Sequence, residues 1–279
     1  MQFFKKIINF YILSNLHVAL AGLCLAKITL LKFEINEHLI PIFVGLSIVV
    51  SYNFIRFYEL KTNKLSSLKG WFLTHLKILG VLSFFSGIGL LYILFFLDFN
   101  MNALKVLFPF LLMTIFYVIP LFKIGNMEFS FRNFPGLKVF SIGVAWAGVT
   151  VLFPLYEAEI EFTLSIYLEF IQRILILIAI IIPFDIRDVQ SDSKKIITLP
   201  QILGVHGSKW LGSVLLILFV LLSLWSQEQL NIEVVISIVV AIITALFLWF
   251  SSPEKPRIYT GFWVEAIPVF WFILIVLFL

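Results

Sequence analysis

Charged residues are scarce in this sequence, and cysteine is nearly absent. Asp, Glu, Lys and Arg make up 13% of the 279 residues, about half the share of a typical soluble domain, whereas hydrophobic residues make up 61% and the mean hydropathy is +1.08. Because so few charges cannot make the surface of a soluble protein of this length wettable, lipid must solvate most of the chain. The single cysteine, Cys24, excludes a disulfide framework and a multi-thiolate metal site, and we interpret it as inert helix packing.

What the chain has instead is a series of apolar runs of about 20 residues, the length that crosses a bilayer as a helix. Proline, glycine and charged residues separate the runs, and the runs lack the alternation typical of a β-barrel strand. We therefore predict an all-α integral membrane protein, a bundle of about nine transmembrane helices that forms one polytopic domain over residues 1–279. The predicted spans are 7–31, 38–58, 71–97, 102–124, 138–156, 163–184, 209–226, 231–250 and 259–278.

The distribution of Lys and Arg predicts the orientation in the membrane. With the N-terminus inside, 15 of the 20 basic residues fall on the inner side, which is the cytoplasmic side by the positive-inside rule. We predict an inner (cell) membrane location, a cytoplasmic N-terminus and a C-terminus on the outer side. The start of the chain is faintly similar to a cleavable signal peptide, but its apolar run continues through Leu31, so we interpret it as the first span. The inner connections 59–70, 125–137 and 185–208 are long and polar, which places the expected chemistry on the inner face.

The strongest local pattern lies at the inner end of the sixth predicted span, in the segment 185–192. On a continuing helix, Asp185, Asp188 and Asp192 fall within an arc of about 60°, and three like charges on one stripe require a cation. Oxygen ligands without nearby His or Cys favour Mg²⁺, which often bridges carboxylates to substrate phosphates. Lys194 and Lys195 follow and are suited to the remaining phosphate charge. The alternative, a charged helix end solvated at the membrane interface, stays open on spacing alone.

This aspartate segment, continuing to Thr198-Leu199-Pro200 and Gly204, resembles the second aspartate motif of the UbiA-type intramembrane prenyltransferases. Softer similarities are Tyr117, Pro120 and Lys123 at the end of the fourth span, Pro135-Gly136-Leu137-Lys138 before the fifth, and the layout of nine helices with the N-terminus inside. The resemblance covers essentially the whole chain. It implies a helical bundle around a lateral cavity, in which Mg²⁺ ions hold a prenyl diphosphate between two aspartate motifs.

The sequence departs from this family at the first aspartate motif. Asn53 matches the Asn of that motif, but Phe54, Phe57 and Lys61 stand where the family has aspartates. Arg56 lies on the same stretch and can bind diphosphate bidentately without a metal. The alternative for Arg56 is an interfacial anchor paired with Glu59.

These observations lead to a principal hypothesis and two alternatives. The principal one is a UbiA-like prenyltransferase, in which Mg²⁺ assists ionisation of a prenyl diphosphate and the prenyl group passes to a lipophilic acceptor. We expect membrane lipid to surround the protein, and we expect no nucleic-acid partner. In this hypothesis the catalytic, metal-binding residues are Asp185, Asp188 and Asp192, and the diphosphate-binding residues are Lys123, Lys194, Lys195, Arg56 and Asn53. The first alternative is a non-catalytic isoprenoid or lipid-phosphate binding protein of the same fold. The second is a secondary transporter, suggested by the intramembrane charges Glu169, Arg173 and Glu265.

Overall fold

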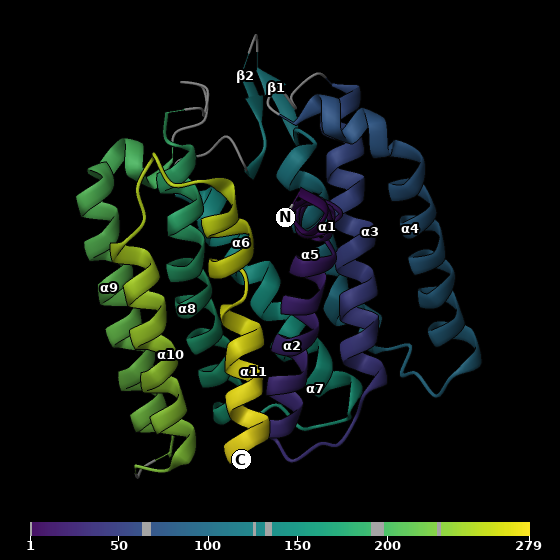
Figure 1. The fold of residues 1–279 in the computed structure, drawn as a ribbon. Helices are drawn as coiled ribbons and strands as arrows, with labels where there is room; N and C mark the ends of the chain where they lie inside the picture. Colours follow the sequence, from purple (N-terminus) through teal and green to yellow (C-terminus); the bar gives the residue numbers. More distant parts are fainter. Residues whose placement is uncertain (1, 63–67, 125–126, 132–135, 191–197, 228–229) are drawn as a thin grey trace.

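The computed structural model describes residues 2–62, 68–124, 127–131, 136–190, 198–227 and 230–279, and these form a bundle of helices (Figure 1). The long helices are α3 (Leu39–Lys61), α4 (Lys69–Phe96), α8 (Leu164–Asp188), α9 (Leu199–Gln227) and α10 (Ile232–Trp249). The shorter helical segments are α1 (Gln2–Leu13), α2 (Leu16–Lys32), α5 (Ala103–Val118), α6 (Leu137–Ala147), the π-helix η2 (Gly148–Leu152), α7 (Phe153–Glu157), the π-helix η3 (Tyr259–Val264) and α11 (Ile267–Phe278).

Length and hydropathy make this an integral membrane protein. Within the described residues, seven helical segments are long and apolar enough to cross a bilayer, and the bent pair α1–α2 makes an eighth. The remaining apolar helix, α5, has 16 residues and is shorter than these. Each predicted span overlaps one of these apolar helices, so the all-α membrane fold is confirmed, while the count of nine crossings stays a prediction.

The fourth predicted span ends earlier than expected. It was predicted over 102–124, but α5 stops at Val118, because Ile119 precedes Pro120 and adopts an extended conformation (φ −84°, ψ 124°). The chain then forms a two-stranded antiparallel hairpin of β1 (Phe122–Ile124) and β2 (Met127–Phe129), which the hydropathy pattern did not indicate.

The seventh helix begins earlier than expected. The sequence predicted a span over 209–226, whereas α9 begins at Leu199 and changes direction at Gly204. The φ of +72° at Gly204 lies in the left-handed region, which a residue without Cβ adopts at no steric cost. The short helical stretch before Gly204 lies next to the end of α8 in sequence and follows the aspartate segment.

A break near the N-terminus separates α1 from α2 and bends their axes by 58°. Asn15 at the break has a left-handed backbone conformation (φ 65°), and its side-chain amide donates a hydrogen bond to Oδ1 of Asn53 on α3 at 2.8 Å. Asn tolerates this conformation better than most residues. In Figure 1, α1 is seen nearly end-on at the centre of the bundle, above α2.

The helices differ in how much of their surface is covered by protein. α8 packs against α6, α9 and α10, and α2 packs against α3 and α11, so α2 and α8 carry much of the core. α4 lies at one edge of the bundle beside α3 (Figure 1) and exposes the aromatic residues Phe84, Phe85, Phe95 and Phe96. We interpret this exposed aromatic face as the lipid contact of α4.

Candidate functional site

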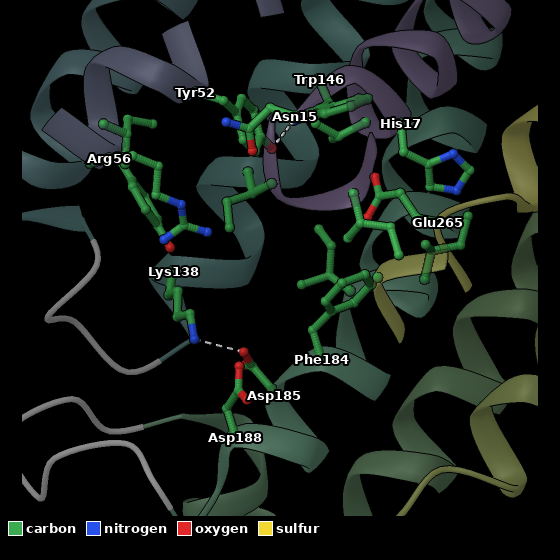
Figure 2. Close-up of a pocket in the computed structure, with 18 of the residues that line it drawn as sticks. Asn15, His17, Tyr52, Arg56, Lys138, Trp146, Phe184, Asp185, Asp188 and Glu265 are labelled. Atoms are coloured by element: carbon green, nitrogen blue, oxygen red, sulfur yellow. Dashed lines mark hydrogen bonds and ion pairs between the residues drawn. The ribbon is translucent and has the colours of Figure 1, made fainter. Parts of the chain in front are cut away.

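A cavity of about 410 Å³ opens inside the bundle, lined by residues of α1, α2, α3, α4, α5, α6, α8 and the C-terminal segment η3–α11. This volume is within the range of small-molecule sites, roughly 300–1,000 Å³. Figure 2 shows Asp185 and Asp188 at one end of the cavity and Asn15, His17 and Tyr52 at the other. The two ends therefore differ in chemistry, and we call the end at Asp185 and Asp188 the mouth.

Two aspartates at the end of α8 line the mouth. Asp185 is 2% exposed and accepts a hydrogen bond at 2.7 Å from Nζ of Lys138, which lies at the start of α6. Asp188 accepts hydrogen bonds from Nε and Nη2 of Arg187 at 2.7 and 2.6 Å, and Nη1 of Arg187 donates to the Thr260 hydroxyl of η3. Because residues three apart share a helix face, α8 brings both carboxylates to the same wall of the cavity.

Arginines from three separate parts of the chain also line the mouth. Arg56 of α3 donates from Nη1 to the buried carboxylate of Glu59 at 2.8 Å. Arg257, in the connection between α10 and η3, is exposed, and partial burial followed by the like charges of Arg187 and Arg56 lowers the pKa of its guanidinium, while Asp188 acts in the opposite direction. Guanidinium groups this close to one another repel, so the arrangement favours a bound anion.

Between the two ends the cavity wall is largely apolar. Residues from six helices contribute: Val18, Phe72, Met113, Ala145, Trp146, Leu177, Ile180, Ile181, Phe184 and Pro268. Such a wall receives a hydrocarbon chain and excludes water from it. The cavity is therefore amphipathic, with a charged mouth and an apolar interior.

The end of the cavity opposite the mouth carries a few polar side chains. His17 is buried, with Nε2 2.9 Å from the carbonyl oxygen of Phe262 and Nδ1 3.0 Å from the Tyr11 hydroxyl. Since a carbonyl only accepts, Nε2 of His17 carries a proton and donates. Tyr52 accepts a hydrogen bond from Nε1 of Trp146 at 3.1 Å. Glu265 projects into the cavity beside these residues (Figure 2).

The structure brings some of the predicted site residues together and leaves others apart. Asp185, Asp188 and Arg56 line the mouth together. Asn53 is buried behind the wall, where it bonds Asn15 and donates to the Ser83 hydroxyl at 3.0 Å, so the described residues do not bring it into the cavity. Lys123 is part of β1. Asp192, Lys194 and Lys195 lie outside the described residues.

The oxygen ligands at the mouth fit one hard divalent cation. Mg²⁺ is usually bound through one or two carboxylates, waters and substrate phosphate oxygens, and Asp185 and Asp188 supply two carboxylates on one wall. In the described part of the chain, no three His, Cys, Asp or Glu side chains converge as a metal site. The α3 side of the mouth carries only the Glu59 carboxylate, which pairs with Arg56. The described residues therefore suit one ion with a phosphate co-ligand rather than two ions.

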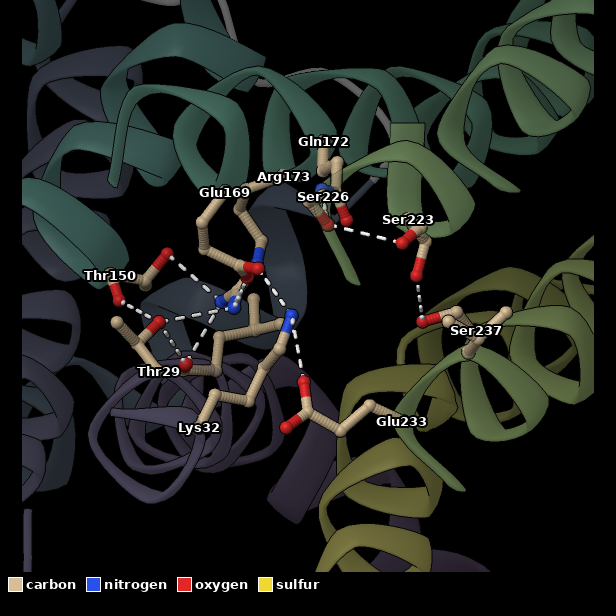
Figure 3. Close-up of polar contacts among 12 residues, drawn as sticks. Thr29, Lys32, Thr150, Glu169, Gln172, Arg173, Ser223, Ser226, Glu233 and Ser237 are labelled. Atoms are coloured by element: carbon tan, nitrogen blue, oxygen red, sulfur yellow. Dashed lines mark hydrogen bonds and ion pairs between the residues drawn. The ribbon is translucent and has the colours of Figure 1, made fainter. Parts of the chain in front are cut away.

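A second polar cluster lies outside the cavity (Figure 3). The predicted pair of Glu169 and Arg173 is present, with Nη2 of Arg173 2.8 Å from Oε1 of Glu169. Lys32 pairs with Glu169 as well, and Glu233 lies 3.9 Å from Lys32. Arg173 also donates to the Leu25 carbonyl at 2.8 Å, which joins α8 to α2. Glu169 lies 16 residues before Asp185 on α8, a rise of about 24 Å, so this cluster is separate from the mouth.

Sequence reasoning assigned no role in the site to Arg257, Asn15 or His17. Arg257 was counted only as one of many basic residues on the inner side, and Asn15 and His17 lie in a run predicted to be one straight span. The Ser14-Asn15 pair inside an apolar run was the available signal for the break between α1 and α2. No sequence pattern pointed to the approach of Arg257 to Arg187, because their separation of 70 residues is bridged only by tertiary packing.

The arrangement of the helices around this cavity can be compared with that of solved membrane proteins. A solved structure of digeranylgeranylglyceryl phosphate synthase in membranes aligns with a TM-score of 0.53 and 17% sequence identity, covering 98% of this chain and 96% of that one. The chain thus has the fold of the UbiA-type intramembrane prenyltransferases, as the aspartate segment predicted. No protein-family model matches the sequence, and no curated protein matches it.

Proposed function

We propose that this protein is a prenyltransferase of the UbiA type, which ionises a prenyl diphosphate and transfers the prenyl group to a lipophilic acceptor. The observation that carries the proposal is the amphipathic cavity: an apolar chamber whose mouth combines the carboxylates of Asp185 and Asp188 with three arginines. A prenyl diphosphate has the same division into an apolar chain and an anionic head. The match between the cavity and a prenyl diphosphate supports this class of donor substrate, as the fold does. It does not bear on the identity of the acceptor.

At the mouth, the proposed role of the basic residues is to hold the diphosphate and stabilise it as it leaves. Arg56, Lys138, Arg187 and Arg257 line the mouth with Glu59, Asp185 and Asp188, so cations outnumber anions by one among these side chains. Mg²⁺ held by Asp185 and Asp188, and by Asp192 as the sequence predicts, would supply further neutralisation of the diphosphate charge. Fixed positive groups act most strongly where charge develops as the C–O bond to the diphosphate breaks.

The apolar interior has a second proposed role, which is to protect the allylic cation from water. The electron pair of the broken C–O bond leaves with the diphosphate, and the positive charge remains on the prenyl chain among apolar side chains. The aromatic rings of Phe184 and Trp146 line this region. Aromatic faces attract cations, so these rings stabilise the allylic cation without reacting with it.

The proposal treats the other predicted diphosphate ligands differently: it keeps Lys123, Lys194 and Lys195, and it gives Asn53 another role. The three lysines stay predicted diphosphate ligands on sequence grounds. Asn53 is better assigned to positioning the break at Asn15, which it contacts at 2.8 Å. The location in the inner membrane, the cytoplasmic N-terminus and the single domain over 1–279 also remain proposals. The first two agree with a mouth lined by basic residues, because the positive-inside rule places basic residues on the cytoplasmic side.

The decisive experiment measures diphosphate release from geranyl, farnesyl and geranylgeranyl diphosphate by the purified protein, with and without Mg²⁺. We expect Mg²⁺-dependent release that falls by about 100-fold or more in Asp185→Asn and Asp188→Asn, since each removes a charge from the proposed ion site. Asp98→Asn is the matched control, because Asp98 is exposed in the connection between α4 and α5. Full release by both mouth variants would refute the proposed site.

The alternative is a protein of the same fold that binds an isoprenoid or lipid phosphate without reaction. It is favoured by one observation: α3 presents Arg56 to the mouth where the family resemblance leads us to expect aspartates. The same assay separates the two. Saturable binding of geranylgeranyl diphosphate, with no diphosphate release for any chain length or acceptor, would assign the binding function.

A further inference from the structure

Glu265 differs from every other carboxylate that lines the cavity. Glu59, Asp185 and Asp188 each pair with a cationic side chain at 2.6–2.8 Å. Within the described residues, the carboxylate of Glu265 has neither a hydrogen-bond donor nor an ion-pair partner, although it lies in a membrane-spanning segment. An unpaired carboxylate in a low-dielectric interior costs free energy, which makes Glu265 a candidate for binding a ligand or taking part in a reaction.

The backbone at Glu265 is distorted in a way that sets the direction of its side chain. The preceding segment η3 is a π-helix, and the Glu265 amide donates to the carbonyl of Thr260, five residues earlier, at 3.1 Å. A π-turn inserts one extra residue into a helix, rotates the following side chains and is frequent at functional sites. In Figure 2 the Glu265 carboxylate accordingly lies in the cavity, with Phe184 between it and Asp185.

The neighbours of Glu265 are less suited to bind the hydroxyl group of a ligand, because their polar atoms already have partners. Both ring nitrogens of His17 are engaged, Nε2 with the Phe262 carbonyl and Nδ1 with the Tyr11 hydroxyl. The Tyr52 hydroxyl accepts from Trp146 and is a weak base. Among the described side chains at this end of the cavity, Glu265 is therefore the carboxylate free to accept a proton from a ligand, and it lies on the far side of Phe184 from the diphosphate-binding mouth.

Resting on the proposed prenyl transfer, we propose that Glu265 is the base that deprotonates the acceptor, and that the acceptor is a neutral lipophilic alcohol or phenol. The acceptor O–H donates a hydrogen bond to the Glu265 carboxylate, which directs the oxygen toward C1 of the prenyl group. As the C1–O bond to the diphosphate breaks with its electron pair, the acceptor oxygen forms a new C1–O bond, and its proton passes to Glu265. An acceptor that carries its own carboxylate is disfavoured, because two like charges would share this end of the cavity.

The test separates ionisation from transfer in one set of assays. Wild type, Glu265→Gln and Glu265→Asp are compared for diphosphate release without acceptor, in which water captures the prenyl cation, and for ether formation with hexadecanol. We expect Glu265→Gln to keep acceptor-independent release within about twofold while ether formation falls by about 100-fold or more, the usual contribution of a general base. Glu265→Asp, which keeps the carboxylate, retains more transfer than Glu265→Gln. Glu161→Gln makes the same chemical change at an exposed position before α8, outside the cavity, and leaves both rates unchanged.

The acceptor class is tested with a pair of phenols that differ in one charge. We expect methyl 4-hydroxybenzoate to be prenylated at least tenfold faster than 4-hydroxybenzoate, and we expect this preference to shrink in Glu265→Gln. Binding of geranylgeranyl diphosphate to Glu265→Gln shows that the variant is folded, and if it does not bind, the ratio of transfer to release in Glu265→Asp decides the question.

Three results would overturn the inference. Ether formation by Glu265→Gln at the wild-type rate removes the base, and equal loss of release and transfer assigns Glu265 to ionisation instead. A preference for the carboxylate-bearing phenol contradicts the acceptor class. If wild type itself releases no diphosphate, the proposed function fails and this inference fails with it, which is distinguishable from the other outcomes.

Discussion

The arginines at the mouth come from α3, α8 and the connection between α10 and η3, and the fold holds them together despite their like charge. Arg56 and Arg187 each have a carboxylate neighbour, at Glu59 and Asp188. Arg257 is exposed, and its pKa is lowered by partial burial and by the two other arginines, although a guanidinium stays charged at neutral pH. Its position at the rim makes it the arginine best placed to meet an incoming diphosphate.

Replacing Arg257 therefore tests the anion-binding role of the mouth directly. We expect Arg257→Ala to weaken binding of geranylgeranyl diphosphate by about tenfold, equivalent to about 1.4 kcal/mol, and to reduce the salt dependence of binding. Lys255→Ala is the matched control, because Lys255 lies in the same connection but over the ring of Tyr259 and outside the cavity. Equal losses in the two variants would mean that the connection contributes only general positive charge.

Among the elements, α8 connects two polar centres with different roles. Its first half carries Glu169 and Arg173, which join α8 to α2 through Lys32 and the Leu25 carbonyl. Its last turn carries Asp185 and Asp188 at the mouth. The contacts of Glu169 and Arg173 join α8 to α2 on the far side of the bundle from the mouth.

The contact between α5 and the segment α6–η2 provides a test of helix packing. A Cβ added at Gly148 would lie 2.1–2.3 Å from three ring atoms of the buried Phe110, so the ring or the helix must shift. We expect Gly148→Ala to destabilise the protein by about 1–3 kcal/mol, the usual cost of overpacking, and to lower the melting temperature in detergent. Gly80→Ala on α4 meets nothing within 4 Å and is expected to be neutral or slightly stabilising. A melting temperature unchanged in Gly148→Ala would show that α5 is free to move.

At the scale of the whole molecule, the orientation in the membrane remains a prediction with a direct test. In a Cys24→Ala background, we expect Glu161→Cys to react with a membrane-impermeant maleimide on intact cells and Lys61→Cys to react only after permeabilisation. Both replaced side chains are exposed. Replacing Cys24 removes the native thiol, which is buried in the bundle. Labelling of Lys61→Cys on intact cells would invert the topology and move the mouth to the outer side.

Part of the site was predictable from the sequence because it lies on one helix. Asp185 and Asp188 share a face of α8 by helical periodicity, and their tie to a charged mouth follows from their place at a span end. Helix α8 ends at Asp188 and Asp192 lies outside the described residues, so the part of Asp192 in the site stays a prediction. Asn53 was assigned to diphosphate by resemblance, whereas its side chain bonds Asn15 and Ser83 within the bundle.

The sequence by itself determined that this is a membrane protein, which segments form apolar helices, and that two aspartates lie at the end of one helix. These features were accessible because hydropathy and periodicity are local properties. Only the tertiary structure decided which helices face one another. The packing of the helices places Arg56, Arg187 and Arg257 on one cavity, and Glu265 lines the same cavity. It also pairs Glu169 with Lys32 and Arg173. A helix determines which residues share a face, but packing between helices determines what that face meets.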